Sequence, residues 1–352
     1  MCLIIHRYVS NDRVTMLSRS LSISSLGRSA TLGGKELKII TVTVNPALDL
    51  TVYTDSLRVG DVHAVSFIRK DSGGKGINVS KVLHRLGVST IATGFLGGSV
   101  GHWIRSDLSR QSIQHRFLEI DGETRTNVKI ITPTEETQLN GTGGLITNHD
   151  LDRLIEQLHS LVQPGDAVVI AGSIPGDADY TMYRTIIESF GKADERSIFI
   201  ALDTSGQALT EAVQARPNFV KPNVEELEQW WGSPLRLESE IAHAARELRS
   251  QGGEIVCVSM GDKGTLLVTS EGLYRAIPPV ITPKSTIGAG DSIVAGFVSQ
   301  FLKNRKPHEA LVYATACGTA TVMHAGSEVC TKEEAEAILP QIQLHVMEGE
   351  ER

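Results

Sequence analysis

The spacing of hydrophobic positions changes repeatedly along the chain and predicts alternating strands and helices. β-branched or apolar runs typical of buried strands occupy residues 38–44, 90–96, 127–131, 167–170, 198–202, 219–220 and 255–258. Apolar residues recur at helical spacing within residues 77–86, 103–108, 148–161, 289–302 and 311–322. Asn148 is the expected N-cap of its helix. Strands separated by helices predict an α/β fold with a mainly parallel central sheet.

Two β-rich stretches, residues 50–70 and 117–140, do not follow this alternation. We expect them to form a small separate sheet, a lid over a site at the carboxyl ends of the main strands. The folded domain is expected to span residues 38–345.

The first 37 residues differ in composition, with four arginines among many serines and only two acids. A transit peptide has this composition. Upstream sequence translated from an early start codon would share it, with Met16 as another candidate start. We expect residues 1–37 to be an N-terminal extension that is disordered or a start-site artefact.

Composition limits the classes of function. The chain has 352 residues, 41% hydrophobic and 21% charged, which is typical of a globular protein and argues against disorder or membrane insertion. Its net charge of −7 argues against nucleic acid as a partner. Four cysteines occur, without the short spacing of a zinc or redox site, so we expect a reducing, cytoplasmic location. The cysteines are Cys2, Cys257, Cys317 and Cys330.

The strongest chemical motif is Ser-Thr-Ile-Gly-Ala-Gly-Asp at residues 285–291, where an acid directly precedes an apolar helical run. Backbone N–H groups at a glycine-rich helix start can hold an anionic oxygen, and a transferring phosphoryl group is such an anion. Beside that cradle, Asp291 could accept the proton of an attacking hydroxyl. The structural alternative is a tight turn with Asp291 capping the helix.

A second glycine-rich stretch, Asp-Ser-Gly-Gly-Lys-Gly-Ile-Asn at residues 71–78, also opens a helix. It fits neither a Walker A loop nor a dinucleotide fingerprint. Gly73 and Gly74 would allow close approach to a ligand, Lys75 would supply charge for a phosphate, and Asn78 would bind hydroxyls. A flexible loop is the alternative.

Two further segments follow predicted strands. Asn223 and Glu226, three residues apart after Lys221-Pro222, could hold hydrated Mg²⁺, or could form a capping box. Residues 258–264 form a strand and a glycine-bearing turn, which by itself indicates a hairpin.

In this order, the four segments resemble those of the ribokinase-like, or phosphofructokinase B, carbohydrate kinase family over residues 38–340. The resemblance implies an αβα sandwich with a β lid, often used for dimerisation, and ATP and Mg²⁺ as cofactors. It implies that Asp291 is the catalytic base and that the backbone of Gly288, Ala289 and Gly290 is the anion hole. Its implied nucleotide-binding residues are Lys221, Asn223, Glu226, Ser259, Gly261, Gly264 and Thr286, with Asn223 and Glu226 holding the metal through water.

The substrate side of the resemblance points to the phosphosugar branch, in which Ser285 replaces the aspartate that many members carry. Asp49 resembles the acid that binds sugar hydroxyls, with Gly73, Gly74, Lys75 and Asn78 beside it. Arg125, in a Thr-Arg-Thr-Asn-Val-Lys stretch, resembles the arginine that holds the substrate phosphate, and Ser173 a serine near it. Gln138 departs from the pattern because related enzymes commonly carry an acid there.

The resemblance therefore implies transfer of the γ-phosphoryl group of MgATP to a ketohexose phosphate, with fructose 1-phosphate expected first. Tagatose 6-phosphate and fructose 6-phosphate remain alternative substrates. A homodimer through the lid is expected. Two other classes of function are kept as alternatives. One is a non-catalytic nucleotide-binding regulator, which usually lacks the base, and the other is a dinucleotide oxidoreductase, whose glycine fingerprint is missing here.

Overall fold

A computed structural model describes residues 31–347 except 33–34, 177 and 193–196. Within the expected N-terminal extension, β1 (Thr31–Leu32) and β2 (Lys35–Glu36) pair antiparallel. The expectation for the preceding residues lies outside the described residues.

The main sheet has ten strands in the order β16-β15-β14-β13-β12-β11-β10-β3-β6-β7. From β13 to β7 the neighbours pair in parallel, as the alternation of strands and helices predicted. These parallel strands are β3 (Ile39–Thr43), β6 (Thr90–Leu96), β7 (His115–Glu119), β10 (Ala167–Ala171), β11 (Phe199–Asp203), β12 (Phe219–Val220) and β13 (Ile255–Ser259). Antiparallel strands extend the other edge, namely β14 (Thr265–Val268), β15 (Leu273–Ile277) and β16 (Gln343–Met347).

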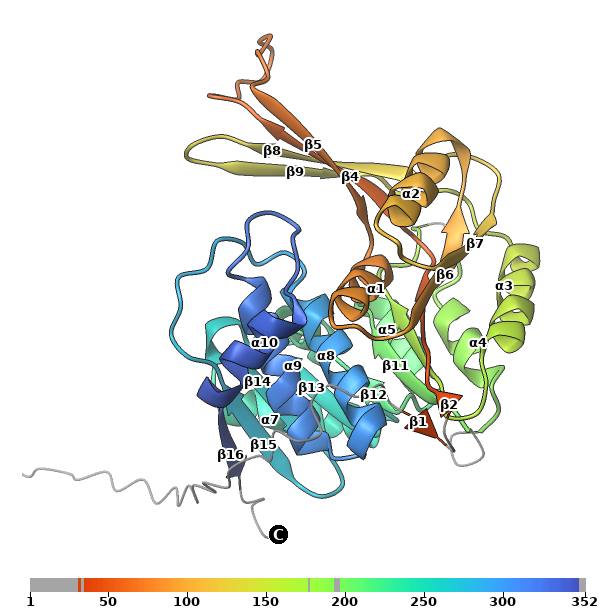
Figure 1. The fold of residues 1–352 in the computed structure, drawn as a ribbon, viewed down its shortest axis with the longest axis vertical. Helices are drawn as coiled ribbons and strands as arrows, with labels where there is room; N and C mark the ends of the chain where they lie inside the picture. Colours follow the sequence, from red (N-terminus) through yellow and green to blue (C-terminus); the bar gives the residue numbers. More distant parts are fainter. Residues whose placement is uncertain (1–30, 33–34, 177, 193–196, 348–352) are drawn as a thin grey trace, which may run out of the picture.

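Helices cover both faces of this sheet (Figure 1). One face carries α1 (Lys75–Arg85), α8 (Ala289–Asn304), α9 (Pro307–Thr321) and α10 (Lys332–Ile338), which continues into η4 (Leu339–Gln341). The other face carries α3 (Asn148–Leu161), α4 (Met182–Glu188), α5 (Gly206–Val213), α6 (Val224–Trp231) and α7 (Glu238–Ser250). The remaining helix, α2 (Gly98–Arg110), packs on β6 and β7.

Strand β3 shows why the strands are continuous apolar runs. Ile39 packs in the core beneath α8 and α9, whereas its neighbour Ile40 packs in the core beneath α3 and α4. Both side chains are fully buried, because a parallel sheet covered on both faces needs apolar residues at every position.

A second sheet of four strands in the order β5-β4-β8-β9 projects from the body and forms the lid (Figure 1). Its strands are β4 (Ala47–Tyr53), β5 (Phe67–Gly73), β8 (Arg125–Ile131) and β9 (Glu136–Asn140).

The lid differs from expectation at two of its boundaries. Residues 62–66, expected as strand, are turn and coil, and Val62 and Val65 are exposed there. Residues 117–119 were expected in the lid but belong to β7, because Phe117 packs in the main body with α2.

The N-cap of α3 also differs from expectation, by one residue. Thr147 is the cap, since its Oγ1 accepts from Asp150 N and the Asp150 carboxylate accepts from Thr147 N. Asn148 is the first helical residue.

The strand order reverses its direction between β3 and β10. From β3 the chain adds β6 and β7 toward one edge, and from β10 it adds β11, β12 and β13 toward the other. Such a switch point leaves a crevice at the carboxyl ends of the strands, where ligands bind in α/β proteins. No helix in the described part of the chain is long and apolar enough to span a bilayer.

Candidate active site

The acid Asp291 lies in the first turn of α8, at the carboxyl end of the sheet. Gly288 precedes the helix with a φ of 77°, a left-handed conformation that glycine adopts without strain. Asp291 does not cap the helix by a side-chain bond; it is buried, and its Oδ2 accepts from Asn78 Nδ2 of α1 at 2.8 Å. The two glycine-rich segments, 213 residues apart in sequence, therefore meet at one carboxylate.

Burial raises the pKa of Asp291 to about 6, and the nearby Asp203 carboxylate acts in the same direction. The cations Lys75 and Lys221 and the Asn78 amide oppose this shift. The Asp291 carboxyl group therefore has a pKa close to neutral pH, as a general base requires.

Asp203, at the end of β11, lies beside this carboxylate and was not singled out from the sequence. Its Oδ1 lies 2.9 Å from Lys75 Nζ and 3.5 Å from Lys221 Nζ, and its buried Oδ2 has no hydrogen-bond partner. Although burial would raise its pKa, the two ammonium groups lower it. No glycine motif marks Asp203 in the sequence. The available signal was its position, an acid that ends an apolar strand.

Lys75 is paired with acids in this structure. Its Nζ lies 2.8 Å from Glu226 Oε1 in addition to the contact with Asp203. Burial opposes protonation, but these two carboxylates raise the pKa of Lys75 above its ordinary value. Lys75 is thus a fixed cation beside Asp291.

Asn223 and Glu226 form a capping box at the start of α6. Asn223 Oδ1 accepts from Glu226 N at 2.7 Å, and Glu226 Oε2 accepts from Asn223 N at 2.9 Å. The structure therefore contains the capping box that was the structural alternative in the sequence, while Glu226 Oε1 pairs with Lys75.

The remaining residues expected at the nucleotide lie on neighbouring segments. Asn223 forms an isolated parallel bridge with Ser259 at the end of β13. Gly261 opens η3 (Gly261–Lys263), and Gly264 follows it with a φ of 85° before β14, which makes the predicted hairpin. Thr286 is exposed in the loop before Gly288, and Lys221 Nζ lies close to Gly290.

The second half of the site lies where the lid joins the body. Asp49 of β4 is held by Asn127 of β8, whose Nδ2 donates to Asp49 Oδ1 at 2.9 Å. A Cβ atom at Gly73 would lie 2.0 Å from Asp49 Oδ2, so the backbone approach there requires glycine. Burial raises the pKa of Asp49. Asn127, two residues after Arg125, was not singled out from the sequence.

Arg125, the first residue of β8, forms no ion pair with the described residues, although it lies close enough to Asp49 for the two charges to interact. It donates from Nη1 to Gly141 O at 3.1 Å and from Nη2 to Asn45 O at 3.0 Å, while its buried Nε has no partner. No ion pair joins Arg125 to any described carboxylate. Ser173, expected near the same ligand, is exposed and lies 3.4 Å from Asn45 Nδ2.

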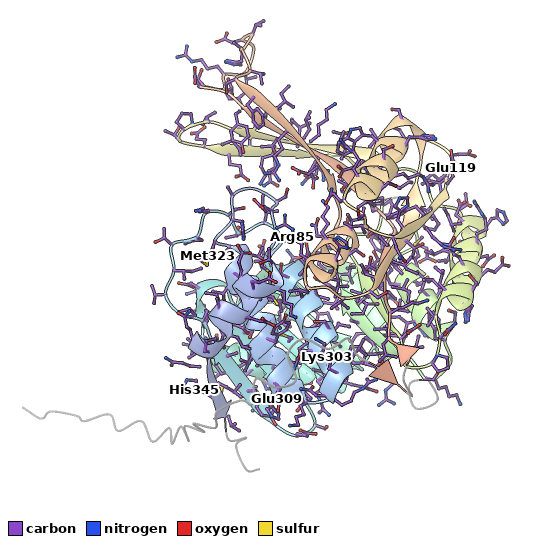
Figure 2. The ribbon with its side chains drawn as sticks, viewed as in Figure 1. Arg85, Glu119, Lys303, Glu309, Met323 and His345 are labelled. Carbon is purple, nitrogen blue, oxygen red and sulfur yellow. The ribbon has the colours of Figure 1, made fainter. Side chains whose placement is uncertain are left out.

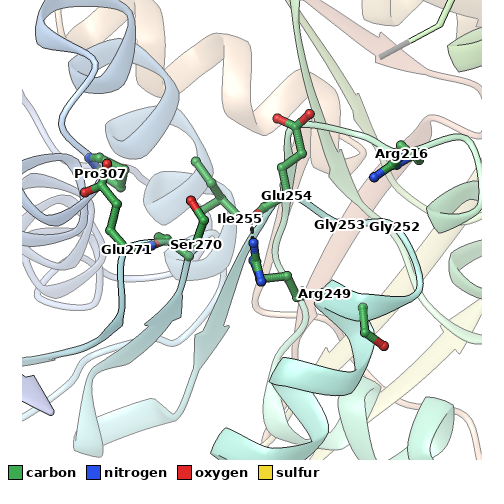
Figure 3. Close-up of a pocket in the computed structure, with 11 residues that line it drawn as sticks. Arg216, Arg249, Gly252, Gly253, Glu254, Ile255, Ser270, Glu271 and Pro307 are labelled. Carbon is green, nitrogen blue, oxygen red and sulfur yellow. Dashed lines mark hydrogen bonds between the residues drawn. The ribbon is translucent and has the colours of Figure 1, made fainter. Parts of the chain in front are cut away.

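A separate pocket lies at the amino ends of the strands (Figure 3). It is lined by groups of both signs, including Arg216, Arg249, Glu254 and Glu271, and Arg249 Nε already donates to Glu254 O. It is remote from the carboxyl ends and contains none of the residues described above.

A buried acid beside a glycine-rich helix start, with an amide and cationic side chains close by, is the arrangement expected of an enzyme that transfers a phosphoryl group to an alcohol. Comparison with known proteins agrees. The profile of the pfkB family carbohydrate kinases matches residues 42–334. The chain belongs to the pfkB family of carbohydrate kinases.

Individual relatives are similar over nearly their whole length. The 1-phosphofructokinase of Bacillus subtilis is 38% identical over 306 residues, which cover 87% of this chain and 99% of the relative. The 1-phosphofructokinase of Haemophilus influenzae is 34% identical over 313 residues, or 88% and 99% of the two chains. The crystal structure of phosphofructokinase-2 from Escherichia coli in complex with potassium superimposes with a TM-score of 0.81 at 27% identity, covering 86% of this chain and 98% of that one. The expected ribokinase-like fold and family are confirmed.

Proposed function

We propose that this enzyme transfers the γ-phosphoryl group of MgATP to the primary hydroxyl of fructose 1-phosphate, giving fructose 1,6-bisphosphate and ADP. The observation that carries the proposal is Arg125, a part-buried guanidinium with an unpartnered Nε and no ion pair to a described residue. A planar guanidinium without a counter-ion suits a phosphate already present on the acceptor. The names of the relatives from B. subtilis and H. influenzae point to the same sugar phosphate.

In this proposal the acceptor lies between the lid and Asp291. Arg125 and Ser173 bind its phosphate, and Asp49, fixed by Asn127, accepts hydrogen bonds from sugar hydroxyls. Because Gly73 has no side chain, the backbone of residues 73–74 can approach the sugar closely. The sugar is thereby fixed at both ends, which orients its free primary hydroxyl.

Asp291 is proposed as the general base. The acceptor oxygen forms a bond to the γ-phosphorus while the bond from that phosphorus to the bridging oxygen of ADP breaks, and the hydroxyl proton passes to the Asp291 carboxylate. The backbone N–H groups of Gly288, Ala289 and Gly290 would stabilise the charge on the transferred group. Asn78 keeps the carboxylate oriented.

The nucleotide half is assigned to residues 221–226, 259–264 and 286–290. Its oxygen ligands fit hydrated Mg²⁺. Asp203 has a buried oxygen without a hydrogen-bond partner, and Glu226 is close by, because Lys75 Nζ contacts both carboxylates. The described residues gather no cluster of three or more metal-ligating side chains, which suits an ion held largely by phosphates and water. Asp203, Asn223 and Glu226 would hold the ion, which neutralises phosphate charge when bound.

A comparison of three acceptors tests the proposed function. Purified enzyme is assayed with MgATP and fructose 1-phosphate, fructose 6-phosphate or tagatose 6-phosphate, and kcat/KM is compared. Fructose 1-phosphate should be preferred at least tenfold. Preference for a 6-phosphate would replace the acceptor, and inactivity with all three would refute the phosphosugar assignment.

The lid is proposed to pair with the lid of a second copy. Its exposed side chains are unusually apolar for a surface, including Phe67, Ile68 and Leu139, which are 58%, 51% and 58% exposed. Light scattering should give a dimer for the wild type and a monomer for Ile68→Glu; a monomeric wild type would contradict the pairing.

A reducing cytoplasm fits the free, buried thiols of Cys257, Cys317 and Cys330.

A further inference from the structure

The segment 322–329, which follows α9, is attached to the rest of the molecule by two arginines from different layers. Arg85 of α1 donates to Val329 O and lies 3.4 Å from Glu328. Arg69 of β5 donates from Nη2 to Ser327 Oγ at 2.9 Å. Figure 2 labels Arg85 on α1 and Met323 at the start of this segment, both below the lid in that view. One anchor is therefore in the body and the other is in the lid.

Arg69 is held in place on the lid side by a two-point ion pair. Its Nε lies 2.8 Å from Asp71 Oδ2, and its Nη2 donates to Asp71 Oδ1 at 3.0 Å. Bidentate pairing fixes the plane of a guanidinium, so the direction of the bond to Ser327 follows the position of β5. Asp71 is the cross-strand partner of Asp49, the acid proposed to bind sugar hydroxyls.

On the other side, the segment contacts the loop that leads into the anion hole. Gly326 O accepts from Ser285 Oγ at 2.8 Å, and the same Oγ accepts from Ile287 N at 3.2 Å. A Cβ atom at Gly326 would lie 2.6 Å from Arg69 Nη1, so the guanidinium sits directly against this backbone. A series of polar contacts thus runs from β5 to the residue before Gly288.

We propose that Arg69 is a positioning residue that couples the two halves of the site: through Ser327 and Gly326 it makes the geometry of the anion-hole loop depend on the position of the lid. This inference rests on the proposed function. A sugar phosphate that fixes the lid then fixes the 322–329 segment and favours nucleotide binding. Linkage requires the nucleotide to favour sugar-phosphate binding by the same factor.

The test is the binding of a non-hydrolysable ATP analogue, by calorimetry, with and without saturating fructose 1-phosphate. The ratio of the two dissociation constants is the coupling. In the wild type we expect a ratio of about 5 to 150, the usual range of such couplings. Arg69→Met should bring the ratio to within about twofold of one, with little change in either ligand's affinity alone. Arg69→Lys keeps the positive charge but loses the bidentate guanidinium, so it should restore part of the coupling that Arg69→Met removes.

Two controls separate coupling from simple stabilisation. Ser327→Ala should remove the coupling in the same way, and the double variant with Arg69→Met should add nothing further. Arg85→Met loosens the same segment from the body side, so it should weaken analogue binding but keep the ratio. A wild-type ratio of one, an unchanged ratio in Arg69→Met, or an equal loss in Arg85→Met would overturn the inference.

Failure of the proposed substrate is recognised separately. It shows as absent wild-type turnover with fructose 1-phosphate, and the coupling is then measured with whichever ketohexose phosphate is turned over. Hydrogen exchange of a peptide covering residues 322–329 needs no sugar at all. Exchange should be faster in Arg69→Met than in the wild type, and equal exchange would refute the anchor.

Discussion

The acid limb of the pH–rate profile tests the chemistry assigned to Asp291. Because burial and Asp203 raise its pKa to about 6, kcat/KM should level off above that pH and fall about tenfold per unit below it. Two substitutions should move the limb in opposite directions. Asn78→Ala removes the donor that stabilises the ionised carboxylate, so the limb should move to higher pH. Asp203→Asn removes a neighbouring negative charge, so the limb should move to lower pH.

The size of each shift follows from the interaction removed. A hydrogen bond to a charged group contributes roughly 1.5 to 3 kcal/mol, and one pKa unit corresponds to about 1.4 kcal/mol. Asn78→Ala should therefore raise the apparent pKa of Asp291 by about one unit or more. Asp203→Asn should lower it by about one unit, since Lys221 then loses its acidic partner, Lys75 keeps only Glu226, and the repulsion between Asp203 and Asp291 is removed.

The opposite directions of the two shifts show whether the acid limb belongs to a group on the enzyme or to the substrate. A phosphate monoester also ionises near pH 6, so a single acid limb could belong to the sugar phosphate. The assay is kcat/KM for fructose 1-phosphate between pH 5 and pH 9 at saturating MgATP, for the wild type and both variants. A substrate limb would stay in place in all three enzymes. That result, or movement of both variants in one direction, would refute Asp291 as the titrating base.

Three more substitutions have defined outcomes. Asp291→Asn should lower kcat by at least about 10²-fold. The pKa of Asp291 is about 6 in the folded protein and 3.8 for an ordinary aspartate, so the stability that its protonated form contributes below pH 3.8 is lost as the pH rises through 6. At pH 8 the free energy of unfolding of this variant, measured in urea, should therefore exceed that of the wild type by up to about 3 kcal/mol. Unchanged or lower stability would contradict the buried charge. Arg125→Ala should raise the KM for sugar phosphate about 10- to 100-fold and leave that for ATP within twofold, and equal changes in both would argue against a phosphate anchor. Glu226→Gln keeps an acceptor for the α6 cap, so Mg²⁺ titration at fixed ATP should show a higher requirement in a folded protein, whereas an unchanged requirement would remove Glu226 from the metal.

Local patterns were sufficient for much of the fold. The continuous apolar runs located β3, β6, β10 and β13, because a doubly covered parallel sheet leaves no polar alternation. The boundaries of the elements were harder to predict. The N-cap of α3 is Thr147 and not Asn148, because both neighbouring side chains can accept a hydrogen bond from a backbone N–H of the first turn. Residues 62–66 show the limit of β-propensity, because Val62 and Val65 are exposed and pair with no described strand of either sheet.

The candidate site was predictable where glycines mark it and not where tertiary contacts create it. Asp291 and Asn78 each stand beside a glycine-rich turn, and the structure brings them together. Asp203 has no such mark, and its importance arises from the two lysines that β12 and α1 place against it. The role of Arg69 depends on Ser327, 258 residues away, which no local pattern can indicate.

The charges around Asp291 explain why its pKa is tunable. Three carboxylates, Asp203, Glu226 and Asp291, share two ammonium groups, Lys75 and Lys221, so the acids outnumber the cations in a buried site. The cations pair with Asp203 and Glu226, whereas among the described residues Asp291 has a side-chain hydrogen bond with Asn78 alone. Asp291 is therefore the carboxyl group of the three that has no ion pair to a described residue, which agrees with its raised pKa. Because the other two carboxylates bind the available positive charge, Asp291 is the one left able to take up a proton near neutral pH, as the proposed base must.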